Sequence, residues 1–196
     1  AAQRQVLQDL VSAGQYTEFG KKYNFEKLFT LKEFKKKVPI HEYDNIKSYI
    51  NRMVEGEDNV LWNTPVKWFA KSSGTTSDKS KFIPISDESL ADNHFKAAKD
   101  VLTNYYNNFP GSDLLTGKSL VVGGSHQLSK VNEEIQFGDL SAVLMQNSPF
   151  WGQWIRTPEL SVALLDEWEN KIEQLAQITA NENVTSLAGV PTWTLI

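Results

Sequence analysis

Short apolar runs typical of β-strands alternate with longer segments of helical periodicity from residue 66 onwards. The strand-like runs occupy residues 66–70, 81–85, 119–122 and 184–188. Two long segments place apolar residues three and four positions apart, and we expect their helices to begin near Ser86 or Asp87 and at Thr157. Strands that alternate with helices favour a sheet with parallel pairs. We therefore expect an α/β fold with a mixed sheet and flanking helices.

The segment before these strands has helical character only. Val6, Leu7, Leu10 and Val11 form an apolar stripe at helical spacing. The lysines between residues 17 and 37 accompany many aromatic residues, and we interpret them as a solvated face. We expect residues 1–60 to form an N-terminal helical segment and residues 61–196 to form the α/β portion.

Composition excludes several classes of function. The chain has no cysteine, which rules out disulfides and thiolate chemistry, and its net charge is −4. We therefore expect no nucleic-acid partner, because phosphate neutralisation needs a basic face. No apolar run is long enough for a membrane span, so we expect no membrane and a cytoplasmic location. The three histidines lack metal-ligand spacing, and we expect no protein metal site.

The last residues, 190–196, are largely apolar. Natural termini are usually polar and loosely held. We expect the α/β portion to be incomplete at its C-terminal end.

A hydroxyl-rich loop joins the first two strand-like runs. It contains Ser72, Ser73, Gly74, Thr75 and Thr76, and the following run begins with Lys81. The glycine allows the backbone to approach a ligand closely, and successive N–H groups in such a turn can form an anion-binding concavity. Short hydroxyl donors and the lysine ammonium add further contacts for phosphate oxygens.

The loop differs from two familiar nucleotide-binding loops. The Walker spacing G-x-x-x-x-G-K-[ST] and the dinucleotide pattern G-x-G-x-x-G are both absent. A Walker loop also joins a strand to a helix, whereas this loop joins two strands. From the residues alone, a solvated hairpin turn is somewhat favoured over a phosphate site, because Ser, Thr and Gly are common in turns.

The stretch 72–84, SSGTTSDKSKFIP, resembles the first signature motif of the GH3 family. That family comprises the auxin-responsive acyl-acid amido synthetases and their bacterial relatives, within the adenylate-forming superfamily of acyl-CoA synthetases and luciferases. The resemblance continues in residues 38–40 with Tyr43, and in residues 49–52, 56–57 and 187–193, and it covers most of residues 38–196. It implies the N-terminal part of the superfamily's large domain, from a bacterial-type member.

The resemblance implies an ATP-dependent acyl-acid amido synthetase. Such an enzyme uses ATP and Mg²⁺ to form an acyl-adenylate from a carboxylic acid, and then an amide with an amino acid. It implies that the ATP phosphates are bound by Ser72, Ser73, Gly74, Thr75, Thr76 and Lys81. The family pattern usually has glycine near the positions of Ser77 and Asp78, where this loop departs from it.

The resemblance places the catalytic residues beyond Ile196, so the 196-residue chain alone is expected to be inactive. An acyl-CoA or aryl-CoA ligase is an alternative, since the loop and the first half-reaction would be the same. A non-catalytic binding domain that retains the fold is another.

The strand end near residue 189 is a second candidate site. Glycine and proline after a strand make a loop that can face a ligand. An acyl-substrate pocket and a structural turn are both open for this candidate, which consists of Gly189, Val190, Pro191 and Trp193. The turn of residues 123–126 also follows a strand, and a plain turn is favoured there.

Overall fold

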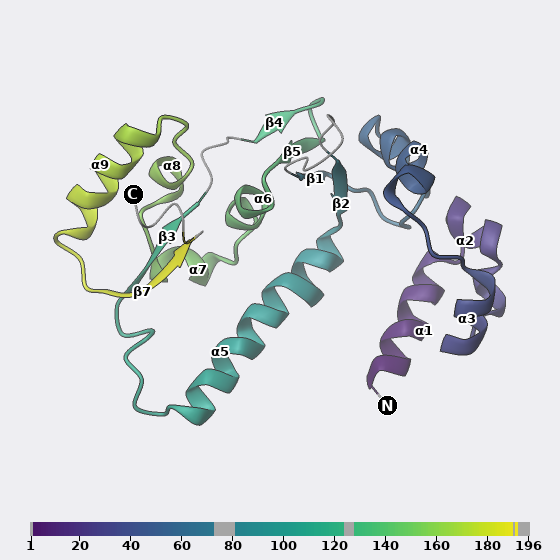
Figure 1. Cartoon of the computed structure of the whole chain (residues 1–196), viewed down its shortest axis with the longest axis horizontal. Helices are drawn as coiled ribbons and strands as arrows, with labels where there is room; N and C mark the ends of the chain where they lie inside the picture. The colour runs from purple at the N-terminus through teal and green to yellow at the C-terminus, as the bar shows by residue number, and fades with distance from the viewer. Residues whose placement is uncertain (1, 73–80, 124–127, 190, 192–196) are drawn as a thin grey trace.

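The computed structural model describes residues 2–72, 81–123, 128–189 and 191. The first part of the chain is helical, and its helices lie together on the right of Figure 1, near the N-terminus. They are α1 (Ala2–Gly14), α2 (Glu18–Tyr23), the 3-10 helix η1 (Phe25–Lys27), α3 (Leu31–Lys37) and α4 (Tyr43–Val54). Helices as short as α2 and α3 need caps, because isolated helices of this length are unstable. Thr17 caps α2 by accepting a hydrogen bond from the Gly20 N–H at 3.0 Å, and Thr30 and Glu33 form a capping box on α3.

The first sheet has the strand order β2-β1-β5-β4. Its strands are β1 (Trp68–Lys71), β2 (Phe82–Ile85), β4 (Ser129–Lys130) and β5 (Gln136–Gly138). β1 is antiparallel to β2 and parallel to β5, and β4 is antiparallel to β5. The sheet is therefore mixed, and β1 is a central strand.

Both faces of β1 are covered, because neighbouring strand residues point to opposite faces. Phe69 is fully buried against Ile50 and Met53 of α4. Ala70, on the opposite face, packs in a cluster with Val143 of α6 (Leu140–Gln146). Figure 1 shows α4 and α6 on either side of the sheet.

The second sheet has three parallel strands in the order β6-β3-β7. Its strands are β3 (Lys118–Val122), β6 (Arg156–Thr157) and β7 (Val184–Gly189). The helices around it are α7 (Phe150–Ile155), α8 (Leu160–Ala163) and α9 (Trp168–Thr179). Because the strands are parallel, their carboxyl ends meet at one edge of the sheet, where Val122 pairs with Gly189.

The helix expected near residue 86 begins there, and Ser86 caps it by accepting a hydrogen bond from the Ser89 N–H at 3.1 Å. Its first part is the π-helical segment η2 (Ser89–Phe95), and α5 (Lys96–Asn108) continues it. Within α5 no side chain is buried, and Val101 is 67% exposed. The rest of the described chain therefore covers the apolar stripe of α5 only in part.

The single helix expected from Thr157 is wrong. Thr157 is extended in β6 and pairs with Leu120 of β3, so helix α8 starts only at Leu160. A second helix, α9, then starts at Trp168. Sheet pairing overrides the helical periodicity of the sequence at this point.

The α/β architecture with a mixed sheet and flanking helices is confirmed. The division at residue 60 stays a prediction; Val60 packs in the same cluster as Phe69. None of the described helices combines the length and the apolar content that a membrane crossing requires.

Candidate functional site

The two strands that flank the hydroxyl-rich loop form an antiparallel hairpin, as the sequence predicts. Lys71 pairs with Phe82 at the open end of the ladder. One step further, the Ser72 N–H donates to the Lys81 carbonyl at 2.9 Å, and the Lys81 N–H donates to Ser72 Oγ at 3.3 Å. These two bonds close the base of the loop, so Ser72 and Lys81 lie opposite each other where the loop leaves the sheet.

Two lysines place positive charge at this base. The Lys81 ammonium lies 5.3 Å from the centre of the Tyr43 ring, and the Lys71 ammonium lies 5.9 Å from the centre of the Phe137 ring. The Lys81 side chain is exposed. Its ammonium stays available to a ligand, because an aromatic face holds a cation without neutralising its charge.

Tyr43 of α4 fixes the strand that carries Lys81. Its hydroxyl donates to the Phe82 carbonyl at 3.2 Å and accepts from the Phe82 N–H at 3.0 Å. β2 is the edge strand of its sheet, and these are the Phe82 groups that its partner strand β1 leaves free. The Tyr43 hydroxyl therefore satisfies both backbone hydrogen-bonding groups of Phe82 at the edge of the hairpin, and the Tyr43 ring also contacts the Lys81 ammonium.

The tip of the loop lies outside the described residues. This holds for Ser73, Gly74, Thr75 and Thr76 of the predicted phosphate site and for the departures at Ser77 and Asp78. Their contact with phosphate stays a prediction, as does that of Ser72 and Lys81, which the structure brings together at the base.

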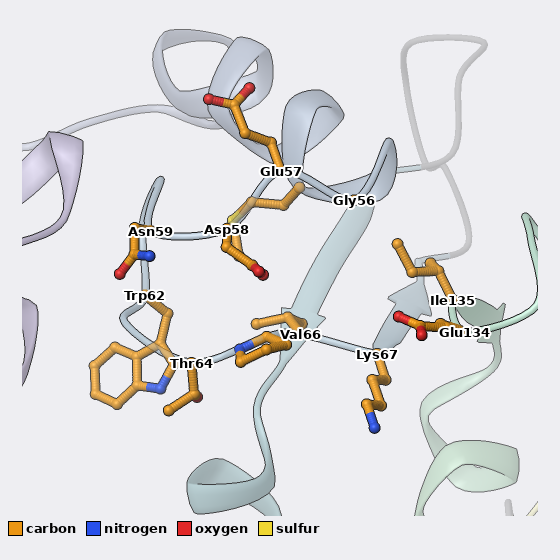
Figure 2. Close-up of a pocket in the computed structure, with 12 residues that line it drawn as sticks. Gly56, Glu57, Asp58, Asn59, Trp62, Thr64, Val66, Lys67, Glu134 and Ile135 are labelled. Carbon is orange, nitrogen blue, oxygen red and sulfur yellow. The ribbon is translucent and has the colours of Figure 1, made fainter.

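A cavity of about 100 Å³ lies at the opposite end of β1 (Figure 2). Its lining includes Asp58, Trp62, Lys67 and Glu134. Figure 2 shows the Asp58 carboxylate directed into the middle of the group of side chains. Apart from Glu134 and Ile135, the residues that line this cavity precede β1 in the chain, whereas the candidate phosphate loop follows β1. The cavity and the loop are therefore two separate sites.

An ion-pair cluster borders this cavity at the end of α4. Arg52 donates from Nε to Glu57 at 2.7 Å and from its terminal nitrogen to Glu18 at 2.6 Å. The hydrogen bonds from Arg52 lower the pKa of both Glu18 and Glu57, and the two carboxylates raise the pKa of Arg52. Arg52 and Glu57 belong to the blocks that resemble the GH3 family, and here the Arg52–Glu18 pair joins α4 to α2.

The second candidate site lies where β7 ends. Gly189 is exposed and pairs with Val122, and Pro191 is exposed as well. Val190 and Trp193 lie outside the described residues, as do residues 124–126 of the neighbouring turn. A cavity of about 310 Å³ in the second half of the chain is lined by Leu128, Gln136, Gln146, Leu160, Ser161 and Leu164. Neither Gly189 nor Pro191 lines it, so the assignment of an acyl-substrate pocket stays a prediction.

Two residues with clear roles in this geometry were missed from the sequence. Tyr43 belongs to the segment that resembles the GH3 family, but the sequence does not indicate its contacts with the hairpin. Lys171 was not considered, although it lies three residues after Trp168 and four before Leu175, on the apolar stripe of α9. A lysine at such a position is the signal that could have identified a buried charge.

The whole chain, residues 1–196, matches the GH3 family N-terminal domain. Indole-3-acetic acid-amido synthetase GH3.3 of Arabidopsis thaliana is 32% identical over 89 residues, which make up 45% of this chain and 15% of that protein. Indole-3-acetic acid-amido synthetase GH3.8 of Oryza sativa subsp. indica is 33% identical over 90 residues, again 45% of this chain and 15% of that protein. The matched part is therefore a small share of each relative.

Two solved structures share the fold. The GH3.15 acyl acid amido synthetase superposes with a TM-score of 0.71 at 21% identity, over 94% of this chain and 32% of that one. The AtGH3.15 acyl acid amido synthetase in complex with 2,4-DB superposes with a TM-score of 0.59 at 26% identity, over 74% of this chain and 25% of that one. This chain thus spans about a third of the length of a GH3 synthetase structure. Because the family match runs over the entire sequence, the chain belongs to the GH3 family.

Proposed function

We propose that this chain is the ATP-binding N-terminal part of an ATP-dependent acyl-acid amido synthetase. The observation that carries the proposal is the β1–β2 hairpin, whose base sets Ser72 and Lys81 opposite each other in the family's signature motif. The GH3 family match supports the enzyme class, since the relatives reported above are amido synthetases. The full activity is proposed for a longer polypeptide, because the matched relatives are several times longer than this chain.

The charges at the base of the hairpin fit a triphosphate. Lys71 and Lys81 lie at the base of the loop, and no acidic residue lies on either strand of the hairpin. In the proposal, the β- and γ-phosphates are bound by Ser72, Ser73, Gly74, Thr75, Thr76 and Lys81. Fixed positive charge and N–H donors at these oxygens stabilise the charge that develops on the leaving pyrophosphate.

Mg²⁺ is proposed to accompany ATP. In the described residues, no group of three or more His, Asp or Glu side chains gathers to hold a metal ion. A metal bridging phosphate oxygens needs only one or two protein carboxylates, because Mg²⁺ keeps several waters. Its role is to share the phosphate charge with Lys81.

The proposed reaction has two steps. A carboxylate oxygen of the acid attacks the α-phosphorus of ATP, the bond to the β-phosphate oxygen breaks, and pyrophosphate leaves. The amine of an amino acid then attacks the acyl carbon, loses a proton and displaces AMP. Gly189, Val190, Pro191 and Trp193 are proposed to line the acid pocket, because ligands bind at the carboxyl ends of parallel strands. The cytoplasmic location expected from the sequence is part of this proposal.

Thermal unfolding of the full-length protein with and without ATP and Mg²⁺ tests the phosphate site. A ligand at 100 times its Kd stabilises the folded state by about 2.7 kcal/mol. We expect a clear rise in Tm for the unmodified protein and a much smaller rise for Lys81→Ala. Lys130→Ala removes an exposed lysine from β4 and is the matched control, which should keep the full rise. An equal rise in Tm in both variants would show that Lys81 does not contribute to the phosphate site.

The acceptor is tested separately. The full-length protein is given ATP and a panel of carboxylic acids, with either amino acids or coenzyme A as acceptor. We expect amide products and no thioester. Thioester formation would identify an acyl-CoA ligase, and the absence of both products with every acid would favour a non-catalytic binding domain.

A further inference from the structure

Among the residues that the structure describes, Lys171 is the only buried residue with a charged side chain, and its exposure is 0%. It lies in the first turn of α9. Removing an ammonium group from water costs several kcal/mol. A buried lysine therefore needs strong local partners, and these partners show what the side chain holds in place.

One partner of Lys171 lies at the end of β3, and two others lie close to it in sequence. Its ammonium donates to the Gly123 carbonyl at 3.3 Å and lies 5.6 Å from the centre of the Trp168 ring. Burial lowers the pKa of Lys171, and the negative charge of Asp166 opposes that shift. The carbonyl, the indole face and the carboxylate together make the protonated form tolerable in this place.

Gly123 is the residue at which the chain leaves β3. The residue before it, Val122, pairs with Gly189, the last residue of β7. A side chain on Gly123 would meet the Met145 methyl group at 2.5 Å, so the Met145 side chain of α6 packs closely against this backbone. Lys171 restrains the carbonyl of the same residue from α9. Side chains from two helices, α6 and α9, therefore contact the residue at which β3 ends.

A neutral side chain could occupy this site without the free-energy cost of desolvating a charge. Replacing a buried charge by an apolar group of similar size is often neutral or stabilising, so stability alone does not explain the lysine. What methionine cannot do is donate a hydrogen bond to the Gly123 carbonyl. The hydrogen bond that restrains the backbone at the end of β3 is therefore what the Lys171 ammonium provides.

We propose that Lys171 is a positioning residue that fixes the paired carboxyl ends of β3 and β7 and thereby shapes the acid pocket beside Gly189. The restraint of the strand ends follows from the contacts of Lys171 alone. The link to the acid pocket rests on the proposed function.

Hydrogen exchange of backbone amides in the full-length protein tests the restraint without any need for activity. Lys171→Met keeps the length of the side chain and removes the donor. We expect exchange in residues 118–123 and 184–189 to become about tenfold faster, with no change in β1 and β2. Lys130→Met on exposed β4 is the matched control and should change neither region. Should Lys171→Met not fold, Lys171→Leu, which also lacks a donor, takes its place. Lys171→Gln keeps an N–H donor without the charge, so we expect a smaller increase in exchange in that variant.

Steady-state kinetics of the same variants test the link to the pocket. We expect Lys171→Met to raise the KM for the carboxylic acid about tenfold and to change the KM for ATP by less than about twofold, because only the acid contacts the strand ends. Unchanged exchange at the strand ends, or an equal increase throughout the chain, would overturn the positioning role. Local exchange that rises while the acid KM stays constant would overturn the link to the pocket. If the unmodified protein activates no acid, the proposed function fails, and the exchange experiment still decides the role of Lys171.

Discussion

Replacing Tyr43 by phenylalanine should loosen the edge of the candidate phosphate hairpin. The change removes one oxygen atom and leaves the ring in place. That oxygen donates to the Phe82 carbonyl at 3.2 Å and accepts from the Phe82 N–H at 3.0 Å. Both backbone groups lose their protein partner, because Phe82 lies on the edge strand β2.

The size of the effect follows from these two hydrogen bonds. A typical intramolecular hydrogen bond contributes about 0.5–1.5 kcal/mol net, so two bonds give about 1–3 kcal/mol. Phe82 is only partly buried, so water can reach part of the freed groups. We therefore expect the free energy of unfolding to fall by about 1–2 kcal/mol.

Urea unfolding followed by circular dichroism measures this loss. With a slope of about 2 kcal/mol/M, the midpoint should fall by about 0.5–1 M. Tyr49→Phe is the matched control, since its hydroxyl accepts a hydrogen bond only from the exposed Lys22 ammonium at 3.0 Å. We expect the control to change the free energy by less than about 0.5 kcal/mol. A Tyr43→Phe loss no larger than that of the control would refute the view that this phenol holds the hairpin edge.

Two further predictions concern the N-terminal helices. Gly20→Ala would place its Cβ 2.0 Å from the last carbonyl oxygen of α1. This clash with rigid backbone should lower the free energy of unfolding by about 3 kcal/mol, despite the helix propensity that alanine adds. The control Gly111→Ala, whose Cβ would have no atom within 4 Å, should change the free energy of unfolding by less than about 0.5 kcal/mol. Equal losses in the two variants would contradict the packing of Gly20 against α1. The second prediction follows from the lowered pKa values of Glu18 and Glu57, whose hydrogen bonds come from Arg52. Because these carboxylates bind protons more weakly in the folded chain, their stabilisation is present above the ordinary pKa of 4.5 and is lost as the pH falls below it. Unfolding free energies measured between about pH 3 and 7 should therefore decline at acid pH less steeply in Arg52→Met, and an unchanged slope would show that the ion pairs do not persist in solution.

The hairpin was predictable from sequence because its signals are local. Strand-like runs flank a stretch of small hydroxyl residues, and the pairing of β1 with β2 needs no distant partner. Ser72 and Lys81 therefore meet at the base of the loop as expected. The pairing of β1 with β5 was not predictable, since β5 has only three residues, Gln136–Gly138. Its register is set by tertiary contacts far along the chain.

Tertiary contacts also explain the two clearest failures. Apolar residues between Leu160 and Ile178 recur at helical spacing in the sequence. In the structure, pairing of Thr157 with β3 delays the first helix, and the chain then forms two helices. The role of Lys171 depends on Gly123, which lies 48 residues away. No spacing within α9 could have identified a carbonyl at the end of another element as its partner.

Acid-dependent exchange of labelled pyrophosphate into ATP by the full-length protein tests the central claim most directly. The account predicts exchange that requires a carboxylic acid and Mg²⁺, that is strongly reduced in Lys81→Ala and that is retained in Lys130→Ala. It also predicts no exchange by the 196-residue chain alone. Absence of exchange with a broad panel of acids, or full exchange in Lys81→Ala, would contradict it.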